Sequence, residues 1–152
     1  MGSRPAGFRI AAYCGLVLGI VSLIAICTWW SLMSWQVSRS IEHWRERAQV
    51  ATSAEDMLAY IGNLRAGLES WDFTEGYCAL VFKGPSNNLS LVYRAVLEAE
   101  VQAHTVSTLP RDSVAYQAGI DNLRGTLREL ALPTEYCWAV RNFPVVLGAW
   151  LV

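Results

Sequence analysis

The sequence has few of the residues on which catalytic and metal sites depend. Its 152 residues include two histidines and four cysteines, and no two cysteines stand in CxxC spacing. The HExxH, GxSxG, GxxxxGK[ST] and GxGxxG patterns are also absent. His43 and His104 are far apart in the chain, and the acidic residues are spread singly over predicted helix faces. The sequence therefore predicts a protein that is not an enzyme and that needs no metal and no cofactor.

Basic residues are scarce as well. Lys83 is the only lysine, and the chain from Ser38 onward contains ten Lys and Arg against thirteen Asp and Glu, a formal charge of −3. A mildly acidic domain without a basic cluster is a poor nucleic-acid binder. We therefore expect no nucleic acid among its partners.

What the sequence does contain is one long apolar run near its N-terminus. The nineteen residues 10–28 carry no charge, and as a helix they would be roughly 28 Å long, about the thickness of the hydrocarbon core of a bilayer. Three tryptophans follow where such a helix would leave the lipid, as in an interfacial aromatic belt: Trp29, Trp30 and Trp35. We therefore expect a short tail (1–9), a transmembrane helix with its interfacial exit (10–37), and a domain held at the bilayer.

A cleaved signal is the alternative for this segment. Arg4 and Arg9 resemble the basic start of a signal, and residues 24–27 approach a lipoprotein cleavage box that would leave Cys27 as a lipid anchor. However, Ile26 is too large for the position before that cysteine, and the run is long for a signal and ends in tryptophans. An uncleaved anchor is the favoured interpretation.

Small residues recur every four positions through the span, so they share one face of the helix: Gly7, Ala11, Gly15 and Gly19. Gly15 and Gly19 form a GxxxG pattern, which lets a second membrane helix approach closely. The alternative is that small residues are simply common in membrane helices. The spacing favours a packing face for another subunit.

Helical spacing predicts the rest of the fold. No helix breaker appears before Thr52, so the membrane helix is expected to continue into water as a stalk (38–52). Three more helices are predicted within residues 53–152: from Ser53 to about Ser70, from Ser86 or Asn88 to about His104, and from Pro110 to Pro133. The predicted fold class is all-α, with one N-terminal transmembrane helix extended as a stalk and then a small three-helix bundle.

An internal repeat (about 53–85 and 112–144) appears when the chain is compared with itself at an offset of 59 residues. Ten of 27 aligned positions are identical, including a Tyr-Cys pair in each unit. In three sequential helices with short connections, the first and third point the same way, so the segments after them emerge at one pole. We therefore predict a disulfide between Cys78 and Cys137, with two buried free thiols as the alternative.

The disulfide also bears on orientation. Two arginines precede the span and three follow it within a short distance, so positive-inside counting is close to a tie. Disulfides persist in oxidising compartments. We therefore expect a single-pass protein of the cell (inner) membrane, with a cytoplasmic N-terminus and a periplasmic or extracellular C-terminal domain.

The C-terminus ends in eight apolar residues after Pro144, a stretch too short to span a bilayer. Three arrangements would bury it: packing on its own bundle, lying in the membrane interface, or docking on a neighbouring subunit. The last two would use its large side chains, which are Phe143, Val146, Leu147, Trp150 and Leu151.

These features together predict a non-catalytic single-pass membrane subunit that assembles with or stabilises a larger membrane protein complex. Its expected partners are the lipid bilayer and other membrane subunits, in a homo- or hetero-oligomer. The alternative is a membrane-anchored extracytoplasmic ligand-binding or sensing module. An apolar pocket lined by four aromatic residues would favour that alternative: Tyr60, Trp71, Tyr116 and Trp138.

Overall fold

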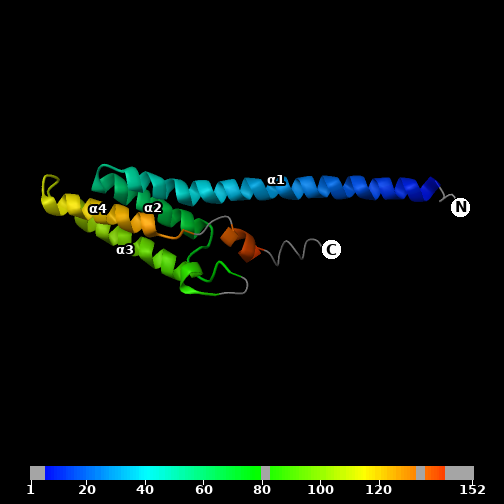
Figure 1. The fold of residues 1–152 in the computed structure, drawn as a ribbon. Coiled ribbons are helices and arrows are strands. Elements are labelled where there is room, and N and C mark those ends of the chain that lie inside the picture. The colour runs from blue at the N-terminus through cyan, green and yellow to red at the C-terminus, as the bar shows by residue number, and fades with distance from the viewer. Residues whose placement is uncertain (1–5, 80–82, 133–135, 143–152) are drawn as a thin grey trace. The chain divides into compact units, whose positions relative to one another are not determined.

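The computed structural model describes residues 6–79, 83–132 and 136–142, with side chains described from residue 13 onward. Its elements in chain order are α1 (Ala6–Val50), α2 (Ala54–Ser70), the short 3-10 helix η1 (Pro85–Asn87), α3 (Leu89–Ser107) and α4 (Val114–Glu129) (Figure 1). Residues 136–142 are also helical, and no strand occurs within the described ranges. The predicted all-α fold class is therefore confirmed. The chain divides into two compact units, Met1–Ser34 and Trp35–Val152.

In the first unit, α1 is an apolar helix whose large side chains are exposed. Leu16 and Leu23 are each about 60% exposed, and none of the apolar stretch is buried within the chain. The few polar side chains bond to their own helix: the hydroxyls of Thr28 and Ser31 donate to the carbonyl oxygen four residues earlier, at 2.8 and 2.9 Å. Such back-bonding satisfies a hydroxyl that has no water to bond. This part of α1 is long and apolar enough to span a membrane.

In the second unit, α2, α3 and α4 form the predicted bundle, and the C-terminal part of α1 packs against it. Val37, Ile41 and Ala48 are at most 1% exposed. The segment 38–52 is helical to Val50, as expected for a stalk. However, it is not surrounded by water on all sides, because Ile41 and Ala48 are part of the core.

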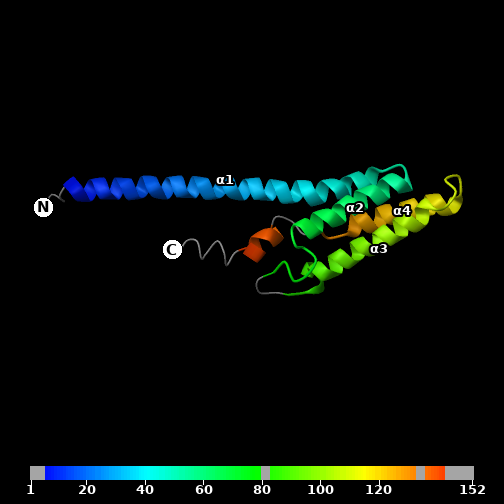
Figure 2. The ribbon, with the colours of Figure 1, turned by 180° about the vertical axis from the view of Figure 1, so that it is seen from behind.

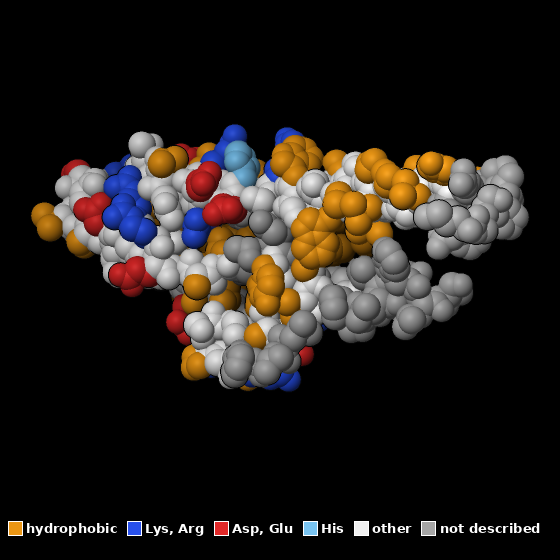
Figure 3. All heavy atoms as spheres, turned by 45° about the vertical axis from the view of Figure 1, so that its right-hand side comes forward, with side chains coloured by type: hydrophobic (Ala, Val, Ile, Leu, Met, Phe, Trp, Pro, Cys, Tyr) orange, Lys and Arg blue, Asp and Glu red, His pale blue; other side chains and the backbone are white. Residues whose placement is uncertain are grey.

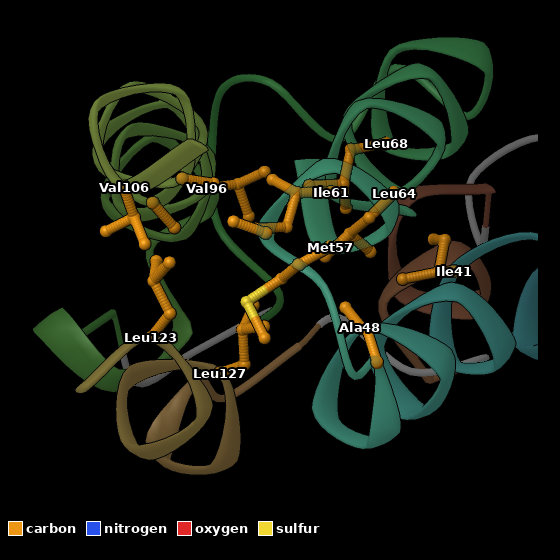
Figure 4. Close-up of a cluster of buried hydrophobic side chains, with 14 of the residues drawn as sticks. Ile41, Ala48, Met57, Ile61, Leu64, Leu68, Val96, Val106, Leu123 and Leu127 are labelled. Atoms are coloured by element: carbon orange, nitrogen blue, oxygen red, sulfur yellow. The ribbon is translucent and has the colours of Figure 1, made fainter. Parts of the chain in front are cut away.

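Side chains of α2 form the centre of that core (Figure 4). Met57, Ile61, Leu64 and Leu68 have no exposed surface, because their spacing places them on one face of the helix. In Figure 4 they lie among side chains from the three neighbouring helices, including Ile41 and Ala48 of α1, Val96 and Val106 of α3, and Leu123 and Leu127 of α4. No buried charged or polar residue interrupts this core in the described part of the chain.

The three bundle helices alternate in direction, so α2 and α4 end at the same pole (Figures 1 and 2). Each begins with a side-chain cap, in which Ser53, Asn88 or Ser113 accepts a hydrogen bond from a backbone N–H of the first turn. Of these, Ser53 is the predicted start of its helix, and Asn88 is one of the two predicted starts of the next.

The predicted ends of two helices need correction. Helix α3 continues about one turn beyond His104 to Ser107. Helix α4 begins at Val114 rather than at Pro110, because the N–H of Ser113 donates to the carbonyl oxygen of Pro110 (3.0 Å) and closes a turn first. It ends at Glu129, before Pro133, which lies outside the described residues.

The helices of the two repeat units bury equivalent positions. Ile61, Leu64 and Leu68 correspond to Ile120, Leu123 and Leu127, and all six are at most 2% exposed. A shared helical spacing is enough to produce this match. The duplication itself stays a prediction.

Helices α1 and α2 approach closely at Gly67. A Cβ atom built there would lie 2.3 Å from the backbone oxygen of Ser40. Glycine at this position therefore sets the distance between the two helices.

Candidate functional site

The apolar part of α1 is the first candidate site. It is the one described helix that is long and apolar enough to cross a membrane, and the apolar stretch is unburied, unlike the core helix of a water-soluble protein. Figure 3 shows hydrophobic side chains gathered along this part of the helix and charged side chains on the bundle. Trp29, Trp30 and Trp35 are between 42% and 57% exposed, as residues in contact with an interface would be.

The predicted packing face is open where its side chains are described. No atom lies within 4 Å of a Cβ built at Gly15 or Gly19. Gly7 and Ala11 belong to the same helix, but their side chains are outside the described part. The face at Gly15 and Gly19 therefore has room for another helix backbone.

The second candidate site is the pole at which α2 and α4 end. Cys78 and Cys137 form a disulfide there, with their Cα atoms 4.5 Å apart, so the predicted pairing is confirmed. The loop before α3 turns back on itself, since the N–H of Cys78 donates to the oxygen of Asn87 (2.8 Å) and the N–H of Leu89 donates to the oxygen of Gly76 (2.9 Å). The bridge attaches the helical segment 136–142 to this loop. We call the loop, the bridge and this segment the disulfide pole.

Arg141, which belongs to no sequence motif, strengthens the disulfide pole. The guanidinium of Arg141 donates to the backbone oxygen of Asp72, to the carboxylate of Asp72 (2.5 Å) and to the backbone oxygen of Glu75 (3.0 Å). Asp72 has a positive φ of 58°, a conformation that its contacts with Arg141 help to hold. These partners are 66 to 69 residues away in sequence, so no local pattern could have indicated them.

The disulfide pole lies at the end of the bundle where α1 enters the second unit. The indole Nε1 of Trp71, at the C-terminal end of α2, donates to the hydroxyl of Ser40 (2.7 Å). Ser40 is five residues after Trp35, the first residue of this unit. Within the second unit, the disulfide pole is therefore at the end of the bundle that contains Ser40 and Trp71.

An open groove runs along the outer face of α1 at this end. Its walls contain three tryptophans, two arginines and a histidine: Trp35, Arg39, His43, Trp44, Arg47 and Trp71. We call it the arginine–tryptophan groove. The guanidinium carbon of Arg39 lies 5.0 Å from the centre of the Trp35 ring, and that of Arg47 lies 5.6 Å from the Trp44 ring. These cation–π contacts hold both cations against aromatic walls.

Within the described ranges, neither groove arginine forms an ion pair. No carboxylate of the described residues lies within ion-pair distance of Arg39 or Arg47, whereas Arg45, on another face, pairs with Glu42 at 3.1 Å. Glu42 and Glu46 line a second, smaller groove that shares Trp35, Arg39 and His43 with the first. The arginine–tryptophan groove itself has no acidic residue in its lining.

Two further contacts shift the pKa of an ionisable group. Arg111 holds Glu55 at 3.0 Å, and this hydrogen bond lowers the pKa of the Glu55 carboxyl while it raises the pKa of Arg111. A hydrogen bond to Glu69 (2.6 Å) raises the pKa of the Tyr93 hydroxyl. No group of three His, Cys, Asp or Glu in the described part of the chain is placed to hold a metal ion.

The four aromatic residues that would favour a sensing module do not meet in one pocket. Trp71 lines the arginine–tryptophan groove, while Tyr116 is buried at the opposite pole, where its hydroxyl accepts a hydrogen bond from the N–H of Ala54 (2.9 Å). Tyr60 stacks on Trp44 with ring centres 6.1 Å apart. Trp138 lies in the segment 136–142.

The apolar C-terminal residues lie outside the described residues: Phe143, Val146, Leu147, Trp150 and Leu151. Their role stays a prediction. The last described residues, Arg141 and Asn142, belong to the disulfide pole, so this is where the segment begins.

Comparisons with known protein families, with curated proteins and with solved structures find no match for this chain. Its function is therefore argued from its own residues.

Proposed function

We propose that the chain is a non-catalytic single-pass membrane subunit that assembles with or stabilises a larger membrane protein complex. The observation that carries the proposal is the apolar stretch of α1, which is not buried in the chain and has an open small-residue face at Gly15 and Gly19. Lipid satisfies the exposed side chains of such a helix, and the small residues let a second helix approach it closely. The bundle then presents a rigid domain at the bilayer surface.

We further propose that this domain faces the periplasm or the exterior of the cell, with the N-terminus in the cytoplasm. The Cys78–Cys137 bridge supports this orientation, because the reducing cytosol keeps most thiols unpaired. Protease digestion of sealed right-side-out vesicles tests it. Digestion of the bundle from outside is expected, and full protection of the bundle would refute the orientation.

Assembly is tested by the size of the protein purified from its native membrane in mild detergent. The wild type should elute with other membrane subunits or as an oligomer, and the double variant Gly15→Leu/Gly19→Leu should elute as a monomer. Val17→Leu is the matched control, because residue 17 lies on the opposite side of the helix and is already large. A wild-type protein that elutes alone as a monomer would refute the proposal.

The intact mass of the same sample tests the uncleaved anchor. A mass without the first 26 residues, with lipid on Cys27, would identify a lipoprotein instead.

A further inference from the structure

We propose that the arginine–tryptophan groove binds the phosphate of an anionic phospholipid headgroup. The inference rests on the proposed membrane anchoring and goes beyond it, since it assigns the groove a ligand. Its three supports are the charge of the groove, its height along α1 and its aromatic walls.

The charge of the groove suits a phosphate. Arg39, His43 and Arg47 are spaced four residues apart on one face of α1, and no acidic residue lines the groove with them. Both arginines are exposed and lack an ion pair among the described residues. A guanidinium donates two parallel hydrogen bonds to a phosphate, which makes arginine well suited to this ligand. Glu42 and Glu46 line the adjacent smaller groove, which shares Trp35, Arg39 and His43 with this one.

The height of the groove along α1 places Arg39 at the level of the lipid phosphates. Arg39 is the first charged residue after Arg9, so the uncharged stretch between them is Ile10–Ser38. As a helix, this stretch is about 43 Å long at 1.5 Å per residue. The predicted hydrocarbon span ends at Thr28, so Arg39 is the first cation beyond the lipid core and can extend its long side chain back toward the headgroups. Trp35 then lies one turn below Arg39, within the interface.

The aromatic walls orient the cations and fit the interface. Trp35 holds the Arg39 guanidinium at 5.0 Å, and Trp71 is fixed by its hydrogen bond to Ser40. Tryptophan rings are favoured at headgroup depth, where one edge is apolar and the other is wet. Lipid is also the most concentrated anion at this depth, which favours a headgroup over an acidic segment of a partner protein.

The proposal is tested by native mass spectrometry of the full chain in detergent, titrated with phosphatidylglycerol or with phosphatidylcholine. The wild type should retain phosphatidylglycerol in preference to phosphatidylcholine. Arg39→Gln should weaken retention of phosphatidylglycerol by about fivefold, as expected for one cation near a lipid surface. Arg47→Gln should weaken it less, because Arg47 is two turns farther from the bilayer.

Arg128→Gln is the matched control, since Arg128 is an exposed helical arginine outside the groove and has no ion pair among the described residues. It should retain phosphatidylglycerol like the wild type. Equal retention by wild type and Arg39→Gln, or equal retention of the two lipids, would overturn the proposal. So would a co-purifying acidic protein that Arg39→Gln removes while phosphatidylglycerol stays bound. A wild-type protein that elutes alone as a monomer would refute the assembly proposal, but it would not change the expected retention of phosphatidylglycerol. Each proposal can therefore be refuted without the other.

Discussion

Replacing Gly67 with alanine should destabilise the bundle, although alanine forms helices better than glycine. The new Cβ would lie 2.3 Å from the backbone oxygen of Ser40 and 3.2 Å from its carbonyl carbon. A backbone carbonyl inside α1 cannot rotate away from the clash. Helices α1 and α2 would therefore have to separate by about 1 Å to restore an ordinary contact.

The magnitude follows from two opposing terms. Overpacking of a rigid contact costs about 1–3 kcal/mol, while the change from glycine to alanine inside a helix stabilises by about 1 kcal/mol. Gly62→Ala is the matched control, because it lies in the same helix and its Cβ would meet only the side-chain oxygen of Glu100, at 3.8 Å. The helix-propensity gain is common to both variants, so their difference in unfolding free energy, about 1–3 kcal/mol, measures the close approach alone.

Urea denaturation of the full chain in detergent, followed by tryptophan fluorescence, provides the measurement. Gly67→Ala should unfold at lower urea than the wild type, and Gly62→Ala at equal or higher urea. If Gly67→Ala were as stable as Gly62→Ala, α2 would not pack on α1 at this point. The segment 38–52 would then be a free stalk, and the packing of its inner face would be refuted.

Three further predictions concern the bundle. Replacing Cys78 and Cys137 with serine should lower the unfolding free energy by about 4 kcal/mol, because the bridge closes a loop of 59 residues; an unchanged urea midpoint in non-reducing buffer would contradict this. Tyr116→Phe should lower the free energy of unfolding by about 1–3 kcal/mol, because the buried N–H of Ala54 loses its acceptor at 2.9 Å. A decrease below about 0.5 kcal/mol in the same assay would show that this hydrogen bond contributes little. The pKa of Glu55 is lowered by Arg111, so stability should fall as the pH drops from the ordinary value of 4.5 through the lowered pKa of the folded state. Arg111→Gln should flatten that part of the pH profile, and an identical acid slope in both proteins would rule out this pair as its cause.

Many features of the second unit could be predicted because they depend on residues close in sequence. Ser53 begins α2 because its hydroxyl accepts from the N–H of Asp56, three residues later. Met57 to Leu68 share one face because 3.6 residues make a turn. The Cys78–Cys137 pair followed from the alternating helix directions and from the Tyr-Cys match between the repeat units.

Other features depend on partners far away in sequence, and these were not predicted. Arg141 finds Asp72 only because the bridge attaches 136–142 beside that loop. Trp71 meets Ser40 across 31 residues, and Gly67 meets the same residue through helix packing. The buried face of the predicted stalk was missed for the same reason, because its contacts come from helices later in the chain.

The sequence by itself determined the four long helices, which of them is apolar enough to span a membrane, and which two cysteines pair. These properties follow from composition, from the helical period and from connection lengths, all of which act locally along the chain. Only the tertiary structure decided that the inner face of the stalk is part of the core, that Arg141 holds the loop, and that two arginines share a groove with three tryptophans. Such contacts arise when packing brings distant segments together, and no local pattern of residues specifies which surfaces will meet.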